Sequence, residues 1–182
     1  MNFDTGRFIL KIAETSEELH AAQRLRYKVF VEEMGANVAD DCHASRMEYD
    51  KFDQDFDHLI LIDSLNRNTA ENVVGVYRLM LNTSVNKNRG FYSSSEYNLD
   101  KLIKADRKIL ELGRSCIDKQ HRGGVALHMM WNGLAQYVID NNVEVLFGVA
   151  SFHGVDINLI NHALSYLHYN HLAPVELRPI AI

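Results

Sequence analysis

Prolines and cysteines are scarce in this sequence, which has two of each among 182 residues. Cys42 and Cys116 lie far apart and cannot supply the set of bridges that holds small secreted domains together, so we expect a reducing, cytoplasmic location. The chain also lacks a CxxC pair, and its nine histidines form no HExxH motif. These absences predict a protein without a metal site.

Long apolar runs and an excess of positive charge are absent as well. No apolar stretch approaches the roughly 20 residues that cross a bilayer, and the opening MNFDTGRFIL lacks the apolar core of a signal peptide. The net charge of −5 argues against a general nucleic-acid-binding protein, because such a protein needs a positive field. We expect no membrane span and no nucleic-acid partner, while peripheral contact with the inner membrane stays open.

The residues that are present suit one globular domain over residues 1–182. With 47% hydrophobic residues the chain can bury one core, and we find no repeat or linker. Apolar runs typical of strands cover residues 8–13, 58–63, 73–81, 109–117 and 143–152, with a weaker candidate in the last ten residues. Helical spacing covers residues 16–35, 99–105, 123–139 and 157–169. This order predicts an α/β (α+β) fold with a single sheet, in which strands 58–63 and 73–81 are antiparallel neighbours.

The segment ELGRSC places charged side chains inside the predicted strand 109–117. Glu111 and Arg114 are three residues apart and would point to opposite faces of a regular strand. We therefore expect a bulge at Leu112 and Gly113, which would expose backbone amides able to polarise a carbonyl oxygen. Cys116 has no evident base and is expected to be a packed, unreactive side chain.

Two further polar groups lie upstream of ELGRSC. EYDKFD brings Glu48, Asp50 and Asp53 together in a long polar segment, residues 36–56, and Arg78 interrupts the apolar strand 73–81. Crowded carboxylates attract a cation, which is either a substrate amine or an arginine, although a solvated acidic loop is the alternative. We predict one network of Glu48, Arg78, Glu111 and Arg114, with either a structural or a catalytic role.

Two basic features complete the candidates. Gly123 and Gly124, next to Arg122, open a helix after a strand, an arrangement that binds phosphate or simply relieves crowding at a helix start. A basic run in the segment 101–108 suits a solvated helix end or a dock for an acidic partner. Its members are Lys101, Lys104, Arg107 and Lys108.

Several of these segments resemble known families. RYKVF (residues 26–30), EYDKFD, Arg78, GFY (residues 90–92) and ELGR resemble the signature of acyl-homoserine-lactone synthases, which belong to the acetyltransferase-like superfamily. Longer blocks, such as VFVEEMGA, GFYSSSEYNL, LHMMWNGLAQYV and HALSYLHYNHLAP, resemble the bacterial ornithine N-acyltransferases that make lyso-ornithine lipid. The resemblance runs from about residue 24 to residue 174. The acetyltransferase phosphate signature is met only approximately around Gly123 and Gly124.

The resemblance implies a GNAT-like N-acyltransferase fold with a mostly antiparallel mixed sheet flanked by helices. It implies transfer of a 3-hydroxyacyl chain to the α-amine of ornithine, with no permanently bound cofactor. The donor would be the acyl-phosphopantetheine of acyl carrier protein, or acyl-CoA. Homoserine-lactone or other N-acyl amino acid synthesis, and a non-catalytic carrier-binding module, stay open as alternatives. The family usually continues past the LAP segment with a further strand pair, which this chain is expected to lack.

The same resemblance suggests a role for each candidate residue. Glu48 is the favoured base or amine-positioning carboxylate, and Asp50 and Asp53 hold the ornithine cation or the loop. Arg78 and Arg114 pair with these acids and with Glu111. The donor-binding residues are Gly113 and Ser115 at the thioester, Arg122, Gly123 and Gly124 at the pantetheine phosphate, and Phe91 in the acyl channel. Trp131 is expected in the channel or in the core, and the basic run Lys101, Lys104, Arg107 and Lys108 is expected to dock the carrier protein.

Overall fold

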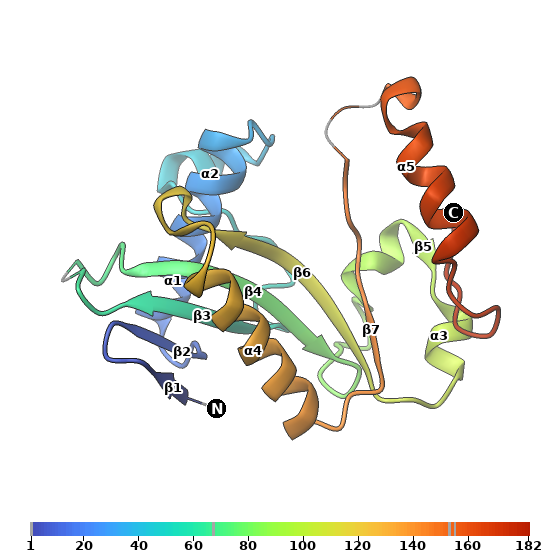
Figure 1. Ribbon diagram of the computed structural model, residues 1–182, viewed down its shortest axis with the longest axis horizontal. Coiled ribbons are helices and arrows are strands. Elements are labelled where there is room, and N and C mark those ends of the chain that lie inside the picture. Colours follow the sequence, from blue (N-terminus) through green and yellow to red (C-terminus); the bar gives the residue numbers. More distant parts are fainter. Residues whose placement is uncertain (1, 67, 153, 155) are drawn as a thin grey trace.

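A twisted six-stranded sheet forms the centre of the protein (Figure 1). The computed structural model describes residues 2–66, 68–152, 154 and 156–182. The strand order is β1-β2-β3-β4-β6-β7. The bounds are β1 Asn2–Asp4, β2 Phe8–Ile12, β3 Asp57–Asp63, β4 Val73–Leu81, β6 Ile109–Ile117 and β7 Val145–Phe147. All neighbours are antiparallel except β6 and β7, which run parallel, so the predicted mixed, mostly antiparallel sheet is confirmed.

The strands β6 and β7 pair over only three residues of each, Ile109–Glu111 with Val145–Phe147. Directly beyond this pairing, Gly148 approaches β6 so closely that a Cβ atom would lie 2.4 Å from the carbonyl oxygen of Leu112. The chain then leaves the sheet, so the predicted strand 143–152 is wrong outside Val145–Phe147. An apolar run shows the tendency to form a strand but not whether a neighbour remains within hydrogen-bonding reach.

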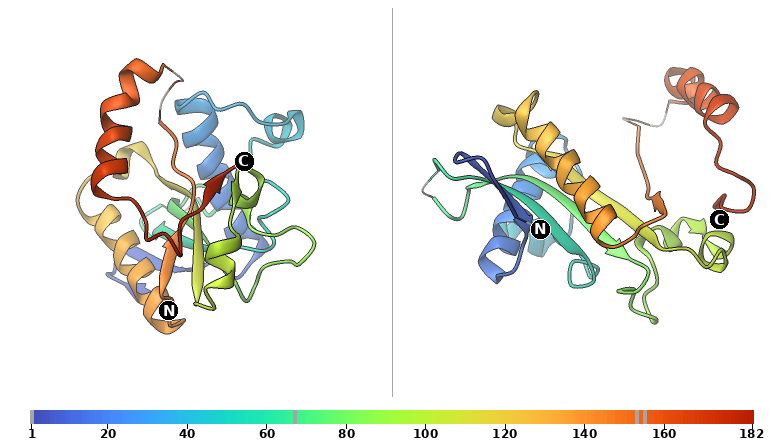
Figure 2. Two further views of the ribbon diagram at one scale, coloured as in Figure 1. Left: turned by 90° about the vertical axis from the view of Figure 1, so that its right-hand side faces the viewer. Right: turned by 60° about the horizontal axis from the view of Figure 1, so that its bottom comes forward.

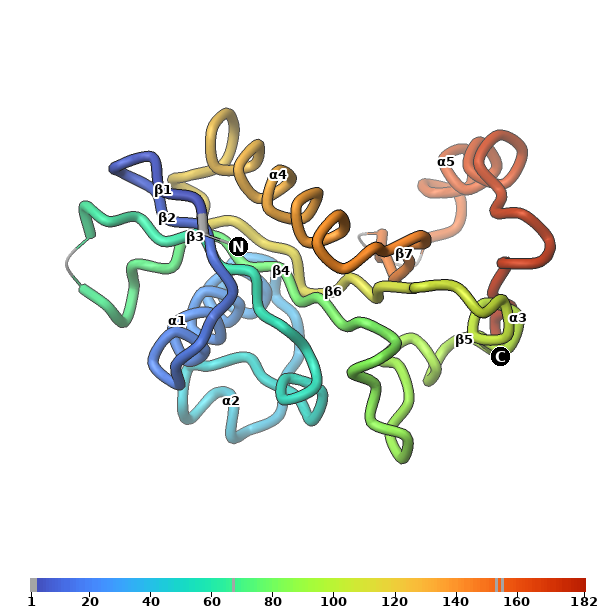
Figure 3. Tube along the Cα trace, turned by 90° about the horizontal axis from the view of Figure 1, so that it is seen from below, coloured from blue at the N-terminus to red at the C-terminus, as the bar shows by residue number. Residues whose placement is uncertain are grey.

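Helices cover both faces of the sheet, as the view from below shows (Figure 3). The helix α4 (Val125–Asp140) packs on one face, and α1 (Ser16–Arg26) packs on the other. Gly133 allows the close approach of α4, since a Cβ atom there would lie 2.5 Å from Leu10. Thr15 caps α1, because Thr15 and Glu18 form a reciprocal capping box.

The segment between α1 and β3 contains more structure than the sequence indicates. The predicted helix 16–35 is α1 followed by a π-helix, η1 (Tyr27–Glu33), and Gly35 has a φ of 73° at its end. A short helix, α2 (Asp40–Ser45), interrupts the predicted loop 36–56. These turns bring EYDKFD back against α1, where the backbone N–H of Glu48 donates to the carbonyl of Gln23 at 3.0 Å.

The C-terminal half carries shorter elements and one helix that stands apart. They are η2 (Tyr92–Ser95), β5 (Tyr97–Asn98), α3 (Asp100–Lys104), η3 (Lys119–His121), α5 (Ile157–Asn170) and β8 (Ile180–Ala181). Asp156 caps α5 by accepting from the N–H of Asn158, and Asn98 accepts from the N–H of Asp100. The helix α5 buries none of its residues and lies away from the sheet (Figure 2). The weak strand prediction near the C-terminus corresponds to β8, which pairs with β5 in a second, two-stranded sheet that the sequence did not predict beside the main one.

Two further observations concern apolar side chains. Trp131 on α4 is 56% exposed, so its predicted place in the core is wrong. The side chains of its neighbours Met129 and Met130 are buried instead.

Among the described residues, no helix combines the length and the apolar character needed to span a bilayer.

Candidate active site

A bulge in β6 sets the geometry of the site. Val76 pairs with Cys116 and Arg78 pairs with Gly113, so Arg114 and Ser115 together face the single residue Tyr77. Arg114 has a φ of 52°, in the left-handed region that a residue with a side chain rarely adopts. The predicted bulge therefore exists, but it lies at Arg114 and Ser115, directly after the predicted position at Leu112 and Gly113. The left-handed turn at Arg114 accompanies ion pairs of its guanidinium with the acidic segment.

Three arginines and three carboxylates form a closed ring of ion pairs, in which each side chain contacts two of opposite charge. Arg26 donates to Glu48 at 2.5 Å and to Asp53 at 2.8 Å. Arg78 donates to Asp53 at 2.7 Å and to Asp50 at 2.8 Å. Arg114 closes the ring by donating to Asp50 at 3.3 Å and to Glu48 at 3.0 Å. The six charges balance, which allows them to lie inside the protein.

Two arginines of this ring are buried, and burial together with the ion pairs shifts the pKa values of its members. Arg26 is fully buried and Arg78 is 1% exposed, so neither guanidinium has access to bulk water. Burial by itself would raise the pKa of Asp53, but Arg26 and Arg78 outweigh it and lower that pKa to about 2. Burial lowers the pKa of Arg114, while Glu48 and then Tyr92 more than offset it, and the pKa rises. Asp53 and Arg114 therefore both stay charged at neutral pH.

Glu111 does not join this ring, contrary to the prediction. Its carboxylate accepts hydrogen bonds from the backbone N–H groups of Tyr92 at 2.9 Å and Ser93 at 2.7 Å, and from the Ser93 hydroxyl at 2.5 Å. The partners come from the start of η2 rather than from the arginines. The spacing of Glu111 and Arg114 could not show this, because the partner segment lies elsewhere in the sequence.

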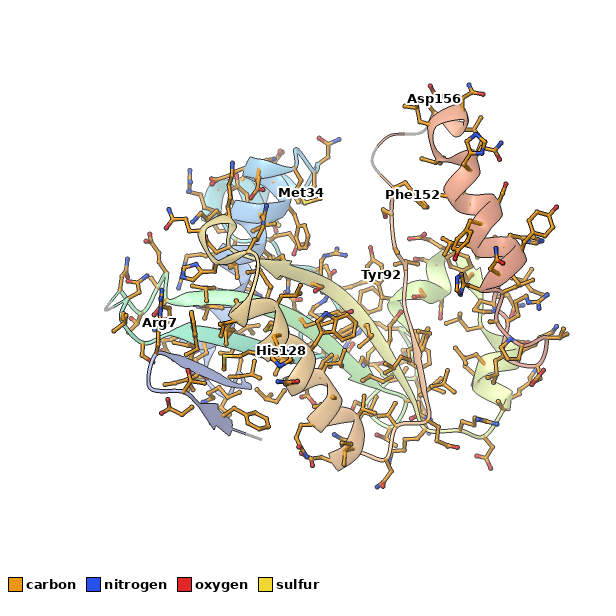
Figure 4. All side chains as sticks on the ribbon, in the orientation of Figure 1. Arg7, Met34, Tyr92, His128, Phe152 and Asp156 are labelled. Atoms are coloured by element: carbon orange, nitrogen blue, oxygen red, sulfur yellow. The ribbon has the colours of Figure 1, made fainter. Side chains whose placement is uncertain are left out.

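A cavity of about 40 Å³ lies beside the bulge, where β6 and the chain after β7 part. Residues from five segments line it, namely Phe56, Arg78, Tyr92, Glu111, Leu112, Gly113, Arg114 and Val149. Figure 4 labels Tyr92 between β6 and the segment that ends at Phe152. The Arg78 guanidinium lies 4.6 Å from the centre of the Phe56 ring, and its buried Nε finds no hydrogen-bond partner among the described residues. The cavity thus combines an aromatic wall, a strand backbone out of register and fixed positive charge.

A larger groove of about 590 Å³ lies along α1 and shares none of the residues that line the cavity. Some of its polar side chains already pair with one another, as Lys28 does with Asp118 at 2.5 Å and His121 with Asp63 at 3.1 Å. We place the candidate active site at the smaller cavity, because the bulge, the ring and the parting strands meet there.

The predicted phosphate site lies at the start of α4. Gly123 and Gly124 have φ values of 88° and 72°, and a Cβ atom at either position would meet nothing within 4 Å. Arg122 does not point freely at this space, because its guanidinium forms a two-point ion pair with Glu33 and donates to the carbonyl of Ile117. The backbone amides of the helix start, rather than the arginine, are therefore the donors that remain for an anion.

The remaining predicted residues do not line the cavity. Phe91 is 4% exposed and packs edge-on against Phe147 with ring centres 5.0 Å apart, so it belongs to the core beneath the cavity. The basic run lies on α3 and the turn after it, where Lys104 pairs with Asp100 at 2.9 Å and Lys101 donates to the carbonyl of Val175. The described residues include no group of acidic, histidine or cysteine side chains that could hold a metal ion.

Sequence reasoning assigned no role to two central residues, Arg26 and Tyr92, although both belong to segments that carry the family resemblance, RYKVF and GFY. Arg26 lies four residues after Ala22 and three before Val29, so it falls on the buried stripe of its helix. An arginine at such a position was a detectable signal for a buried acidic partner. Tyr92 lies in a segment without periodicity, and no local pattern indicates that it reaches the cavity.

The fold is that of the GNAT class, and the chain contains a domain of this acetyltransferase family. The family model described as acetyltransferase (GNAT) domain matches residues 25–132. Among solved structures, the CoA-dependent acyl-homoserine lactone synthase BjaI, solved with SAM and isopentyl-CoA, superposes with a TM-score of 0.54. That similarity has 19% sequence identity and covers 91% of this chain and 74% of BjaI, so it supports the fold alone.

Sequence comparison identifies the particular family. The chain is 46% identical over 173 residues to the L-ornithine N(alpha)-acyltransferase of Rhodobacter capsulatus, covering 94% of this chain and 67% of that protein. It is 34% identical over 180 residues to the enzyme of the same name from Agrobacterium fabrum, covering 97% of this chain and 61% of that protein. This chain belongs to the L-ornithine N(alpha)-acyltransferase family. It spans about two thirds of the length of these relatives.

Proposed function

We propose that this protein transfers an acyl chain from a thioester to the α-amine of ornithine. The observation that carries the proposal is the cavity at the parting of β6 and β7, bounded by the bulge at Arg114 and Ser115. An opening of this kind admits the end of an extended donor next to backbone that is free of ladder pairing. The acceptor comes from the names of the relatives at 46% and 34% identity.

The protein needs to do little covalent chemistry in this reaction. A neutral amine attacks the thioester carbonyl, the C–S bond breaks, and the amine proton is lost as the thiol forms. The enzyme must hold both reactants, accept a proton and stabilise the oxyanion. In our proposal the backbone around Gly113, Arg114 and Ser115 faces the thioester oxygen, with the positive charge of Arg114 nearby.

The ring supplies the carboxylates for the acceptor. The Asp50 side chain is 22% exposed, whereas those of Glu48 and Asp53 are 7% and 8% exposed. Both oxygens of Glu48 and both oxygens of Asp50 accept from arginines, so the greater exposure of Asp50 decides between them. We therefore assign contact with the ornithine amine to Asp50, and we assign the positioning of Arg114 to Glu48. Asp53, with a pKa of about 2, is a poor proton acceptor at neutral pH and holds the arginines.

The donor is proposed to be acyl-phosphopantetheine on acyl carrier protein, with acyl-CoA as the alternative. Its phosphate would meet the amides at Gly123 and Gly124, which lie beyond the end of β6 and open to solvent. The acidic carrier protein would dock on the basic run, which has exposed members on α3. We place the reaction in the cytoplasm, with peripheral contact between the membrane and the fatty product.

The test supplies the purified protein with acyl carrier protein or CoA thioesters and with isotope-labelled ornithine, glycine or S-adenosylmethionine. Mass spectrometry should detect acyl-ornithine only. An acyl-homoserine lactone or acyl-glycine as the main product would overturn the assignment of ornithine. Binding of the acyl donor without any product would instead support a non-catalytic carrier-binding module. Asp50→Asn should lose most turnover, whereas Asp41→Asn, an exposed acid on α2, should not.

A further inference from the structure

Glu111 is an acid in the middle of a buried strand with three hydrogen-bond donors, all from one short segment. It is 1% exposed, lies between Leu110 and Leu112, and faces Met80 on β4. One oxygen accepts from the N–H of Tyr92, and the other accepts from the N–H and the hydroxyl of Ser93. The carboxylate therefore joins the start of η2 to β6, across 18 residues of sequence.

The segment is held on both sides of Tyr92. Phe91 is buried against Phe147, and Ser93 is 2% exposed beneath the carboxylate of Glu111. Tyr92 itself lines the cavity. Its ring packs edge-on against Phe52 at 5.4 Å and faces the guanidinium of Arg114 at 5.1 Å. Tyr92 thus contacts a member of the ring of ion pairs and lines the cavity, whereas neither Phe91 nor Ser93 lines it.

We propose that Glu111 is a positioning residue that acts through Tyr92, and that Tyr92 is the wall of the cavity against which the acyl thioester rests. This inference rests on the proposed acyl transfer. A base must release hydrogen bonds that its carboxylate accepts, and Glu111 accepts three, two of them from the buried Ser93. If the carboxylate took up a proton and lost one of these hydrogen bonds, the donor would be left unsatisfied at a cost of about 1–3 kcal/mol. This cost opposes a role of Glu111 as the base.

The role follows from the geometry of the cavity. The backbone of Tyr92 is held by two hydrogen bonds to Glu111, one from its own N–H and one from the N–H of Ser93, while its ring contacts Phe52 and Arg114. Loosening the segment would shift the ring relative to Gly113 and Arg114. A misplacement of about 1 Å at a reacting group can cost on the order of 100-fold in rate.

The first arm of the test needs no substrate. Amide hydrogen exchange is measured in the wild-type protein, in Glu111→Gln, in Ser93→Ala and in the matched control Ser94→Ala, whose side chain is exposed on the same turn. We expect faster exchange at Tyr92 and Ser93 in Glu111→Gln, with β3 and β4 as protected as in the wild type. Unchanged exchange at both amides would overturn the positioning role. If Glu111→Gln fails to fold, Ser93→Ala, which keeps the carboxylate, carries the same comparison.

The second arm is kinetic and separates positioning from proton transfer. Glu111→Gln and Ser93→Ala should each lower kcat, by about 100-fold and about 10-fold, with an unchanged KM for ornithine and an unchanged shape of the pH–rate profile. The double variant should be no slower than Glu111→Gln, and Tyr92→Ala should reproduce its loss. Loss of the acidic limb of the profile in Glu111→Gln, together with full activity of Ser93→Ala, would show a base and overturn the proposal.

The two arms also separate this inference from the proposed function. A wild-type protein that makes no acyl-ornithine from either donor refutes the proposed function. The exchange data then still decide whether Glu111 holds the segment. A wild-type protein that makes acyl-ornithine, combined with a fully active Glu111→Gln, refutes the positioning role alone.

Discussion

Arg26 and Asp53 face each other as a two-point ion pair inside the protein. Nη1 donates to Oδ1 at 2.8 Å and Nη2 donates to Oδ2 at 3.2 Å, with Arg26 fully buried. The pair fastens the segment 48–53 to α1, and Gln23 adds a third donor to Asp53 at 2.9 Å. This relationship places the carboxylates of EYDKFD beneath Arg78 and Arg114, and it therefore sets one side of the site.

Replacement of Arg26 tests the ring as a source of stability. Arg26→Met leaves Glu48 and Asp53 buried with fewer partners, so the free energy of unfolding should fall by about 3–5 kcal/mol. Urea denaturation followed by circular dichroism measures the change. Arg107→Met removes an exposed arginine and should change stability by less than about 0.5 kcal/mol. Equal, small losses in the two variants would show that the ring is dispensable for stability.

The low pKa of Asp53 predicts a pH dependence of stability. Because its folded pKa of about 2 lies below the ordinary 3.8, the stabilisation is fully present above about pH 5 and is lost as the pH falls toward 2. The shift corresponds to about 2 kcal/mol. The free energy of unfolding, measured from pH 6 to pH 2, should fall less steeply in Asp53→Asn than in the wild type. Parallel curves for the two proteins would contradict this origin of the acid sensitivity.

Cys116 should be unreactive although it lies one residue from the bulge. Burial raises the pKa of its thiol to about 12, so at pH 8 only about one molecule in 10⁴ carries the thiolate. Iodoacetamide at pH 8 should leave the Cys116 peptide unmodified in the native protein and modify it fully in urea, as mass spectrometry can show. Cys116→Ala should keep most of the acyl-transfer activity. Rapid labelling of native Cys116, or an inactive but folded Cys116→Ala, would return this thiol to the candidate nucleophiles.

Charge reversal tests the carrier-protein dock. Lys104→Glu combined with Lys108→Glu should raise the KM for acyl carrier protein by about 10-fold at low salt and by less at about 0.5 M salt, because screening weakens the attraction. The KM for acyl-CoA should not change, which separates docking from damage to the cavity. Lys87→Glu, an exposed lysine on another loop, is the matched control. An unchanged KM for the carrier protein at low salt would remove the basic run from the docking surface.

The strands and helices with strong local patterns follow directly from the sequence. The predicted strands 73–81 and 109–117 match β4 and β6, and the helix 157–169 matches α5 within one residue at its C-terminal end. Their apolar spacing is a property of consecutive residues, so no distant partner is needed to recognise it. The presence of a bulge near Gly113 was also predictable, since charged side chains at Glu111 and Arg114 conflict with a regular strand.

The sequence does not show which segment each of these side chains contacts in the folded protein. Glu111 binds η2 rather than an arginine, Arg26 enters the ring from α1, and Trp131 lies at the surface. Each outcome depends on which segment fills the space opposite a side chain, and that space exists only after the layers have packed. The strand 143–152 ends early for the same reason, because its pairing depends on the course of β6 after Leu112.

By itself, the sequence determined which residues carry charge into the apolar strands and which segments become helix or strand, because both depend on neighbours along the chain. The tertiary structure alone decided that three arginines and three acids close into one ring, that Glu111 holds Tyr92, and that the cavity opens where β6 and β7 part. The ring alone joins residues up to 66 positions apart, and a buried charge selects its partner by proximity in space rather than in sequence.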